Sequence, residues 1–172
     1  DHPWYHKGFI QDQVKKLPKW VILINRKIFL KKASKFKCSK KIFLDRSGSR
    51  FSHCQIFNQK PINKWVKKNN LIIYKPEKLP FKKQIHLFKN ASVILGAHGA
   101  AFTNIIFCKP GTKIIEIIPA NHPNRKCERI SKILKLKYFR IVTKSDNSNK
   151  NFPFRIHLEK KHLKMIEKAI NL

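Results

Sequence analysis

The sequence has few glycines, few acidic residues and no long apolar run, and these shortages exclude several classes of protein. Its five glycines do not form the GxGxxG pattern of dinucleotide-binding proteins. No apolar run approaches the roughly 18 residues that cross a bilayer, so the sequence contains no membrane span. The four cysteines form no CxxC pair, which argues against a bound metal. We expect Cys38, Cys54, Cys108 and Cys127 to be buried free thiols of a protein from a reducing compartment.

Acidic residues are scarce relative to basic ones, with 9 Asp and Glu against 39 Lys and Arg and a formal charge of +30. Such an excess indicates nucleic acid or an anionic membrane surface as a partner. The lysines are, however, spread along the chain and accompany many Ile and Asn residues, as an AT-rich coding sequence would produce. A solvated surface of biased composition is therefore favoured over a polyanionic partner. Because no nucleic-acid-binding motif is recognised, we predict no nucleic acid partner, and an anionic membrane surface stays open.

Apolar runs of strand length alternate with segments of helical period from Lys41 onward. The strands are predicted at 41–45, 71–75, 92–96, 113–118 and 137–143, and the helices at 58–69, 80–90, 100–108, 123–135 and 156–170. Since parallel neighbours need a crossover, five strands that are each followed by a helix predict an α/β fold. The expected architecture is a Rossmann-like, doubly wound parallel sheet of about five strands.

The first 40 residues follow a different pattern. The stretch "LPKWVILINRKIFLKK", residues 17–32, predicts a helix with Trp20, Ile24, Ile28 and Phe29 on one face. We expect residues 1–40 to be a helical lead-in or inter-domain segment and residues 41–172 to be the Rossmann-like domain. Because the sequence begins at Asp1 without a methionine, we expect a fragment or a processed product.

The turn "AHG", residues 97–99, joins the third predicted strand to the next helix. Ligands of such sheets bind at the carboxyl ends of the strands, where helix N-termini favour a phosphate. Gly96 and Gly99 would let the backbone bend sharply and a ligand approach closely. His98 would then project into the site, to donate a hydrogen bond or carry a proton. A short glycine turn also occurs without any ligand, and a lone histidine there is more often structural, so the turn alone leaves its role open.

The stretch "HGAAFTNIIFCKPGTKIIEI" closely resembles the central motif of the glycosyltransferase 61 family. The positions that carry the resemblance are His98, Gly99, Ala100, Asn104, Phe107, Pro110, Gly111 and Glu116. Upstream, "IFLDRSGSR" is similar to the family's strand followed by an arginine pair, and "LPFKKQIHLFKNASVILGAHGA" to its glutamine-bearing helix before the turn. The resemblance covers residues 41–120. It departs from the family where Gln59 follows Asn58, because the family usually has an Asn-Glu pair there.

The resemblance implies one half of a GT-B glycosyltransferase, an architecture in which two Rossmann-like domains face each other across a cleft. This chain would be the C-terminal domain, which binds a nucleotide-sugar donor, with a UDP-sugar as the expected donor. The enzyme would transfer the sugar to a glycan or lipid-linked acceptor in polysaccharide biosynthesis. It would be inverting and would need neither a metal ion nor another cofactor. The expected location is the cytoplasm, including the periphery of a membrane.

The resemblance also assigns roles to single residues. Arg46 and Arg50 are candidates for binding the diphosphate, since a guanidinium pairs well with phosphate oxygens. The alternative for both is a solvated loop arginine. His98 is the candidate catalytic residue. Gly99 and Ala100 would lie beside the donor, with their backbone N–H groups near the phosphates.

Other candidates have two interpretations each. Asn104 either contacts the donor or is a core amide that ties neighbouring loops. Glu116 either reaches the ribose hydroxyls or pairs with a buried cation, because a carboxylate in an apolar strand is costly to bury alone. Gln84 and Asn58 are expected to be structural supports. Two other functions stay open for the chain, a basic nucleic-acid-binding α/β module and a non-catalytic donor-domain fragment.

Overall fold

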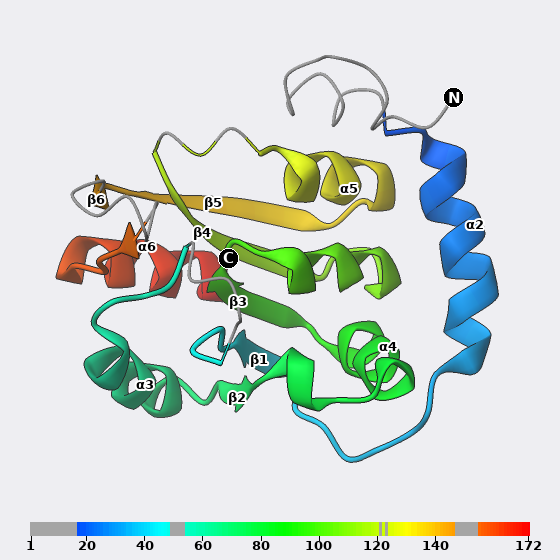
Figure 1. Cartoon of the computed structure of the whole chain (residues 1–172), viewed down its shortest axis with the longest axis horizontal. Coiled ribbons are helices and arrows are strands. Elements are labelled where there is room, and N and C mark those ends of the chain that lie inside the picture. The colour runs from blue at the N-terminus through cyan, green and yellow to red at the C-terminus, as the bar shows by residue number, and fades with distance from the viewer. Residues whose placement is uncertain (1–16, 49–53, 121, 123, 147–154) are drawn as a thin grey trace.

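A five-stranded sheet, with every strand parallel to its neighbours, forms the centre of the computed structural model (Figure 1). The structure describes residues 17–48, 54–120, 122, 124–146 and 155–172. The strands lie in the order β2-β1-β3-β4-β5, with the bounds β1 Lys41–Leu44, β2 Ile72–Tyr74, β3 Val93–Ala97, β4 Lys113–Pro119 and β5 Lys137–Thr143. Each predicted strand is confirmed to within one residue at either end. The predicted Rossmann-like α/β class is therefore confirmed.

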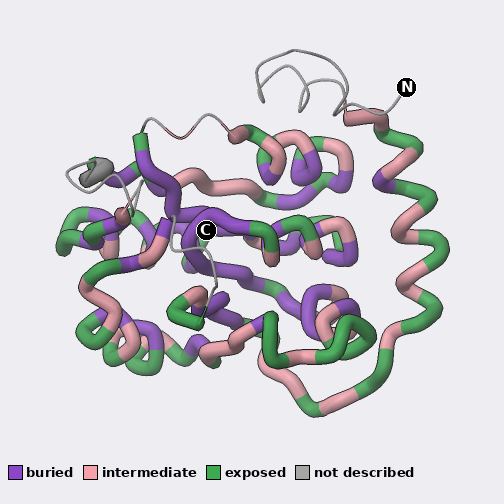
Figure 2. The backbone as a smooth tube through the Cα atoms, viewed as in Figure 1, coloured by how far each residue is buried: buried purple, intermediate pink, exposed green. Residues whose placement is uncertain are grey.

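Helices cover both faces of the sheet. The helices on one face are α4 (Phe81–Asn90), the 3₁₀ helix η4 (Ala100–Phe107) and α5 (Lys126–Leu134), and those on the other are α3 (Gln59–Lys68) and α6 (Lys160–Asn171). Successive strand residues point to opposite faces, so Ile42 and Leu44 join the first core whereas Phe43 joins the second. The inner strands β1, β3 and β4 are buried along most of their length, whereas the edge strands β2 and β5 are mostly half-buried or exposed (Figure 2). This double covering explains why the strands read as continuous apolar runs.

Two predicted helices differ from the observed ones. The segment after the turn is a 3₁₀ helix and not an α-helix, because hydrogen bonds from residue i+3 to residue i close both of its ends: Phe102 to Gly99 and Cys108 to Ile105. The last helix begins at Lys160 and not near residue 156. The preceding strand β7 (Arg155–Ile156) instead pairs antiparallel with β6 (Ser145–Asp146).

The predicted lead-in helix is present as α2 (Lys19–Phe29), followed by the 3₁₀ turn η2 (Leu30–Lys32). It stands as the blue column at the right-hand edge of Figure 1. The predicted apolar face is split, because Phe29 packs against the core whereas Trp20, Ile24 and Ile28 are exposed. Ile22, which the prediction did not single out, is the buried residue of this helix. Apolar residues lie on two sides of the helix, and the sequence alone does not show which side packs against the core.

All four cysteines are free, and Cys54, Cys108 and Cys127 are buried as predicted, whereas Cys38 is only half-buried. Burial raises the pKa of the Cys54 thiol to about 12. Among the residues that the structure describes, no helix combines the length and the apolar character needed to cross a membrane.

Candidate functional site

The candidate site lies where the carboxyl ends of β1 and β3 meet. The chain leaves β1 toward β2 on one side and later returns to β3 on the other, so this pair is the switch point of the sheet. A cavity of about 90 Å³ opens there, and we call it the β1–β3 cavity. Its lining residues are Phe43, Leu44, Arg46, Ser47, Gln55, Ile56, Gln59 and Ala97. Ligands of doubly wound sheets bind at this position, so the fold brings the candidate Arg46 to the expected place.

Arg46 is positioned by the loop that follows β1. The buried carboxylate of Asp45 accepts hydrogen bonds from the N–H and the hydroxyl of Ser47, at 2.8 and 2.9 Å. The ammonium of Lys75 lies 3.6 Å from the same carboxylate. From this loop, Nη1 of Arg46 donates to the backbone carbonyl of His98 at 2.8 Å. Burial lowers the pKa of Arg46 below its ordinary value, but a guanidinium keeps its charge in proteins.

Gly99 leaves the room that the Arg46 guanidinium occupies. A Cβ at residue 99 would overlap Nη1 of Arg46. The backbone of Gly99 is extended, with φ 171° and ψ −179°, so the glycine is required by space and not by a backbone angle. The room beside Gly99, which we expected to admit a ligand, is thus occupied by the side chain of Arg46. The second candidate arginine, Arg50, lies outside the described residues.

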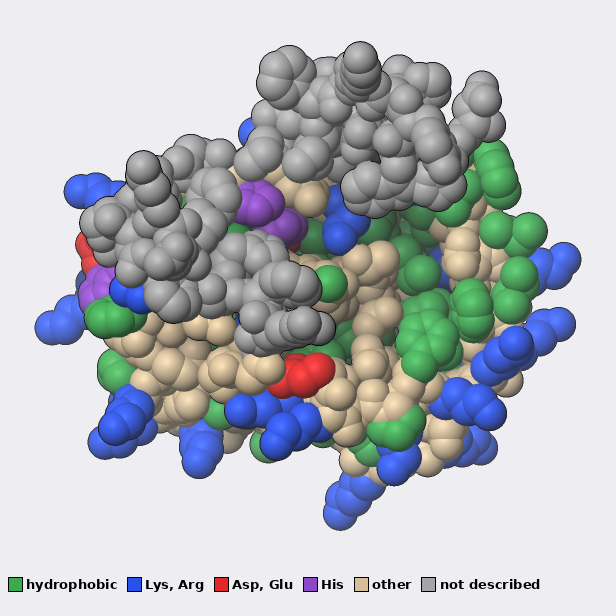
Figure 3. Space-filling model, in the orientation of Figure 1, with side chains coloured by type: hydrophobic (Ala, Val, Ile, Leu, Met, Phe, Trp, Pro, Cys, Tyr) green, Lys and Arg blue, Asp and Glu red, His purple; other side chains and the backbone are tan. Residues whose placement is uncertain are grey.

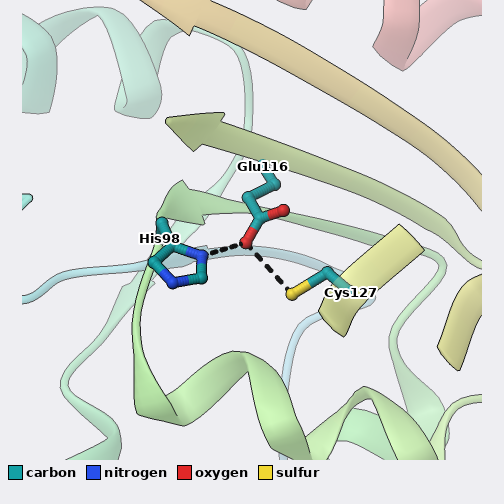
Figure 4. Close-up of side chains that lie close together, drawn as sticks. All are labelled: His98, Glu116 and Cys127. Atoms are coloured by element: carbon teal, nitrogen blue, oxygen red, sulfur yellow. Dashed lines mark hydrogen bonds and ion pairs between the residues drawn. The ribbon is translucent and has the colours of Figure 1, made fainter. Parts of the chain in front are cut away.

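A second group of polar side chains lies beside the same turn, and we call it the Glu116 cluster: the buried His98, Glu116 and Cys127 and the half-buried Tyr138. Oε1 of Glu116 accepts from Nδ1 of His98 at 2.6 Å and from Sγ of Cys127 at 3.0 Å. Oε2 accepts from the hydroxyl of Tyr138 at 2.5 Å. Figure 4 shows His98 and Cys127 converging on this carboxylate, with the second ring nitrogen of His98 turned away from it. The carboxylate lies on β4, and its three donors come from the turn after β3, from α5 and from β5.

The pKa values agree with an ionised carboxylate. Burial by itself would raise the pKa of Glu116, but the hydrogen bond and charge of His98 and the bonds from Tyr138 and Cys127 bring it below its ordinary value. Burial and the negative charge of Glu116 raise the pKa of the Tyr138 hydroxyl and of the Cys127 thiol, so both remain protonated donors. With Glu116 ionised, the proton of the shared bond lies on Nδ1 of His98, and Nε2 is free to serve another partner.

The cluster has the distances of hydrogen bonds and not those of a metal site. The ligand atoms of His98, Glu116 and Cys127 lie within 4.8 Å of one another, which makes a metal worth testing. Zinc bonds of about 2.0–2.3 Å would hold tetrahedral ligands roughly 3.3–3.7 Å apart. The observed pairs are closer, at 2.6 and 3.0 Å, which are hydrogen-bond distances.

The cluster has little contact with solvent. His98 is 4% exposed and Glu116 is 1% exposed. The ring of His122 lies over that of His98, with the ring centroids 4.3 Å apart. Arg140, which pairs with Glu116 in the sheet register, donates to the carbonyl of His122 at 3.3 Å. Both oxygens of Glu116 have partners inside the protein, as the buried-pair interpretation requires.

The remaining candidates lie around η4 and α4. Ala100 opens η4 and is exposed. The side chain of Asn104 donates to Oε1 of Gln84 at 2.8 Å. Nε2 of Gln84 donates in turn to the carbonyls of Pro76 and Leu79, both at 2.9 Å. Asn104 therefore has the contacts of an amide that ties neighbouring loops, one of its two interpretations.

Sequence reasoning missed several residues of both regions. Tyr138 and Cys127 lie beyond residue 120, where the family resemblance ends, although a glutamate inside an apolar strand signals that buried donors must exist. Gln59, the departure from the family pattern, lines the β1–β3 cavity. Its neighbour Asn58 exchanges two hydrogen bonds with the backbone of Leu158, at 2.8 and 3.1 Å, which fixes the start of α3.

Comparisons with known proteins point in one direction. The model of the family Glycosyltransferase 61 matches residues 6–115. A relative from Arabidopsis thaliana, named beta-1,2-xylosyltransferase, is 40% identical over 60 residues, and beta-1,2-xylosyltransferase RCN11 from Oryza sativa subsp. japonica is 37% identical over 60 residues. Each match covers 35% of this chain and 11% of the relative. The match therefore spans only about a tenth of the length of these relatives.

Proposed function

Because this chain belongs to the glycosyltransferase 61 family, we propose that it is the donor-binding part of an enzyme that transfers a sugar from a nucleoside diphosphate to a glycan hydroxyl. In the proposed GT-B arrangement, this Rossmann-like domain faces a second domain that holds most of the acceptor. The acceptor oxygen bonds to the anomeric carbon while the bond from that carbon to the diphosphate oxygen breaks. The acceptor proton passes to a base of the second domain. A single displacement of this kind inverts the anomeric configuration.

The position of Arg46 is the observation that carries this proposal. It lines the β1–β3 cavity and contacts the backbone of the turn at residues 98–99. Negative charge accumulates on the leaving diphosphate, and fixed cations and backbone amides stabilise it when no metal ion does so. A guanidinium binds phosphate oxygens through two parallel hydrogen bonds. The amides of Gly99 and Ala100, at the start of η4, add donors of the kind that phosphates prefer.

His98 is the proposed catalytic residue, acting on the leaving group. In its protonated form, Nδ1–H stays bonded to Glu116, and Nε2–H donates to the diphosphate oxygen that leaves the anomeric carbon. The anionic carboxylate of Glu116 balances the imidazolium in a site that excludes water. Glu116 is then a positioning residue, since it acts on the substrate through His98 alone.

The names of the relatives suggest which donor to test first. Both are called beta-1,2-xylosyltransferases, so we propose a nucleotide-activated xylose, with UDP as its nucleotide part. The acceptor would then be a glycan hydroxyl.

The test measures nucleotide binding to the 172-residue chain by calorimetry and by thermal shift, with UDP-xylose, UDP, ADP and inorganic phosphate as ligands. We expect UDP and UDP-xylose to raise the melting temperature. Arg46→Ala should weaken their binding by about tenfold or more, because hydrogen bonds to charged groups contribute about 1.5–3 kcal/mol. Arg46→Lys should keep part of the affinity, because it retains the charge without the forked geometry.

Arg125→Ala is the matched control. This arginine forms a surface ion pair with Glu128 at 3.1 Å, away from the cavity lining. Its removal should leave the affinity for UDP unchanged. If no nucleoside diphosphate shifts the melting temperature, or if folded Arg46→Ala binds UDP as tightly as the unsubstituted chain, the proposal is wrong.

A further inference from the structure

The outer face of α2 is apolar and uncovered. Trp20 is 66% exposed, Leu23 43%, Ile24 46% and Ile28 45%. Their spacing of three, four and eight residues from Trp20 puts them on one side of the helix. We call them the α2 ridge. Figure 3 shows hydrophobic side chains gathered over α2 at the right of the molecule, among blue Lys and Arg side chains.

The inner face of α2 is fixed, so the ridge has a defined orientation. Ile22 is buried, and the ring of Phe29 packs edge-on against Phe81 and Phe107 at centroid distances of 5.4 and 6.5 Å. The Arg26 guanidinium donates to the carbonyls of Ile106 and Cys108. The helix cannot turn its ridge inward without breaking these contacts.

Basic residues surround the ridge and acidic residues are absent from its sequence. Between Leu17 and Leu44 there are nine Lys and Arg residues and no Asp or Glu. Lys27, which is exposed, follows Leu23 by four residues and lies on the same side as the ridge, and Lys31 is exposed in η2, directly after α2. The ridge therefore combines apolar side chains with a concentrated positive charge.

This combination fits a lipid surface better than a protein surface. The core of a protein interface is depleted in lysine, because burial strips water from its ammonium group. At a membrane, the long stem of a lysine lies along the apolar boundary while its ammonium stays among the headgroups. An amphipathic helix with lysines beside its Trp, Leu and Ile residues has the composition of an interfacial helix, and anionic headgroups attract nearby Lys and Arg residues.

We propose that α2 docks this protein on an anionic membrane surface, with Trp20, Leu23, Ile24 and Ile28 in the boundary between headgroups and acyl chains. Lys27 and Lys31 bind lipid phosphates or carboxylates beside them. The inference is independent of nucleotide binding, since no residue of the ridge lines the β1–β3 cavity. It also gives a specific location to the membrane contact that the charge of the chain leaves open.

The experiment is co-sedimentation of the full chain with vesicles of phosphatidylcholine alone or of phosphatidylcholine and phosphatidylserine in equal parts. The chain should bind the mixed vesicles. The double variant Ile24→Ser, Ile28→Ser should bind them about tenfold less or weaker still, because insertion of each side chain gains about 25 cal/mol per Å² of apolar surface. The matched control is Met165→Ser with Val142→Ser, two exposed apolar residues outside α2, which should bind within twofold of the unsubstituted chain.

Tryptophan emission gives a second measurement. In a chain with Trp4→Phe and Trp65→Phe, the emission of Trp20 should shift to the blue on mixed vesicles and should be quenched by brominated lipid. Three outcomes overturn the proposal. The first is binding that high salt abolishes and that Ile24→Ser, Ile28→Ser leaves intact, which shows adsorption by charge alone. The second is no binding to mixed vesicles. The third is a dimer in sedimentation equilibrium that the same double variant abolishes, which shows that the ridge contacts a second copy.

Discussion

The Glu116 cluster and the β1–β3 cavity border the same turn, but their polar groups are satisfied in different ways. In the cluster, one carboxylate holds three donors at 2.5–3.0 Å, and hardly any of it meets solvent. In the cavity, Arg46, Ser47, Gln55 and Gln59 line an open volume of about 90 Å³. The cluster is enclosed by the fold, whereas the cavity is an open volume, although Arg46, Ser47 and Gln59 also have hydrogen-bond partners within the chain.

This difference bears on which side chains are ordered before a ligand binds. A group that is already ordered loses little entropy when a substrate arrives, so a completed cluster keeps His98 in position in advance. A polar cavity provides affinity only through the partners that a ligand supplies. The two regions should therefore respond differently to substitution, the cluster mainly in stability and the cavity mainly in binding.

The largest expected effect comes from Glu116→Ala. It leaves three buried donors without their acceptor, and it should lower the free energy of unfolding by about 3–5 kcal/mol. Urea unfolding measures this change. Gln55→Ala, in the cavity, is the control and should change the same quantity by no more than about 0.5 kcal/mol. Equal losses of unfolding free energy in the two variants would show that the cluster and the cavity do not differ in their contribution to stability.

Gly99→Ala should have the next largest effect, because it touches both regions. The new Cβ overlaps Nη1 of Arg46, so the guanidinium or the turn must move, at a cost of about 1–3 kcal/mol in the free energy of unfolding. The affinity for UDP should fall as well, since Arg46 leaves its place. At Gly48, a Cβ would approach only the carboxylate end of Glu77, at 2.8 Å, and that side chain can move. Gly48→Ala should therefore be nearly neutral, and a matching loss there would show that the cause is not Arg46.

Acid should weaken the cluster, because Glu116 is protonated as the pH falls. The pKa of Glu116 lies below its ordinary value of 4.5 in the folded protein, so the unfolded chain binds its proton first as the pH falls. The stability that Glu116 contributes is therefore present above about pH 4.5 and is lost as the pH falls through the folded pKa. The difference in unfolding free energy between the unsubstituted chain and Glu116→Gln should shrink over this range, by at most about 1.4 kcal/mol per pH unit. A difference that grows on acidification would mean that the pKa of Glu116 is raised.

The smallest effect on stability is expected from Gln59→Ala. Its amide donates to Asn63 on the same helix, at 2.7 Å, so the free energy of unfolding should change by about 0.5 kcal/mol or less. The affinity for UDP should fall by about two- to tenfold, because a single hydrogen bond is worth about 0.5–1.5 kcal/mol. Calorimetry compares this loss with that of Glu128→Ala, a surface carboxylate outside the cavity lining. If Gln59→Ala binds UDP as tightly as the unsubstituted chain, the β1–β3 cavity is not part of the donor site.

The elements of the sheet could be predicted because their pattern is local. Residues 113–118, with one charged side chain among four isoleucines after Lys113, indicate a strand buried on both faces, and β4 is such a strand. The turn of Pro110 and Gly111 ahead of it is also local, since Gly111 has φ +81°, a backbone angle that favours glycine. Signals of this kind need no knowledge of distant residues.

The contacts of the site could not be predicted, because they depend on distant residues. The resemblance identified His98 and Glu116, but their bond depends on the parallel register that sets β3 beside β4. Tyr138 reaches the same carboxylate from β5, more than 20 residues away in sequence. In the same way, the sequence shows that residue 99 is glycine, but only the structure shows that Arg46 is the neighbour that requires it.

The hydrogen bonds of Arg26 fix the position of α2 relative to η4. This side chain holds the carbonyls of Ile106 and Cys108, at the far end of the helix that starts beside the glycine turn. An eight-residue 3₁₀ helix is about 16 Å long, since each residue rises by about 2 Å. Helix η4 therefore holds α2 and the glycine turn at a fixed separation. Whatever surface α2 rests on, the turn at residues 97–99 lies at a fixed distance from it.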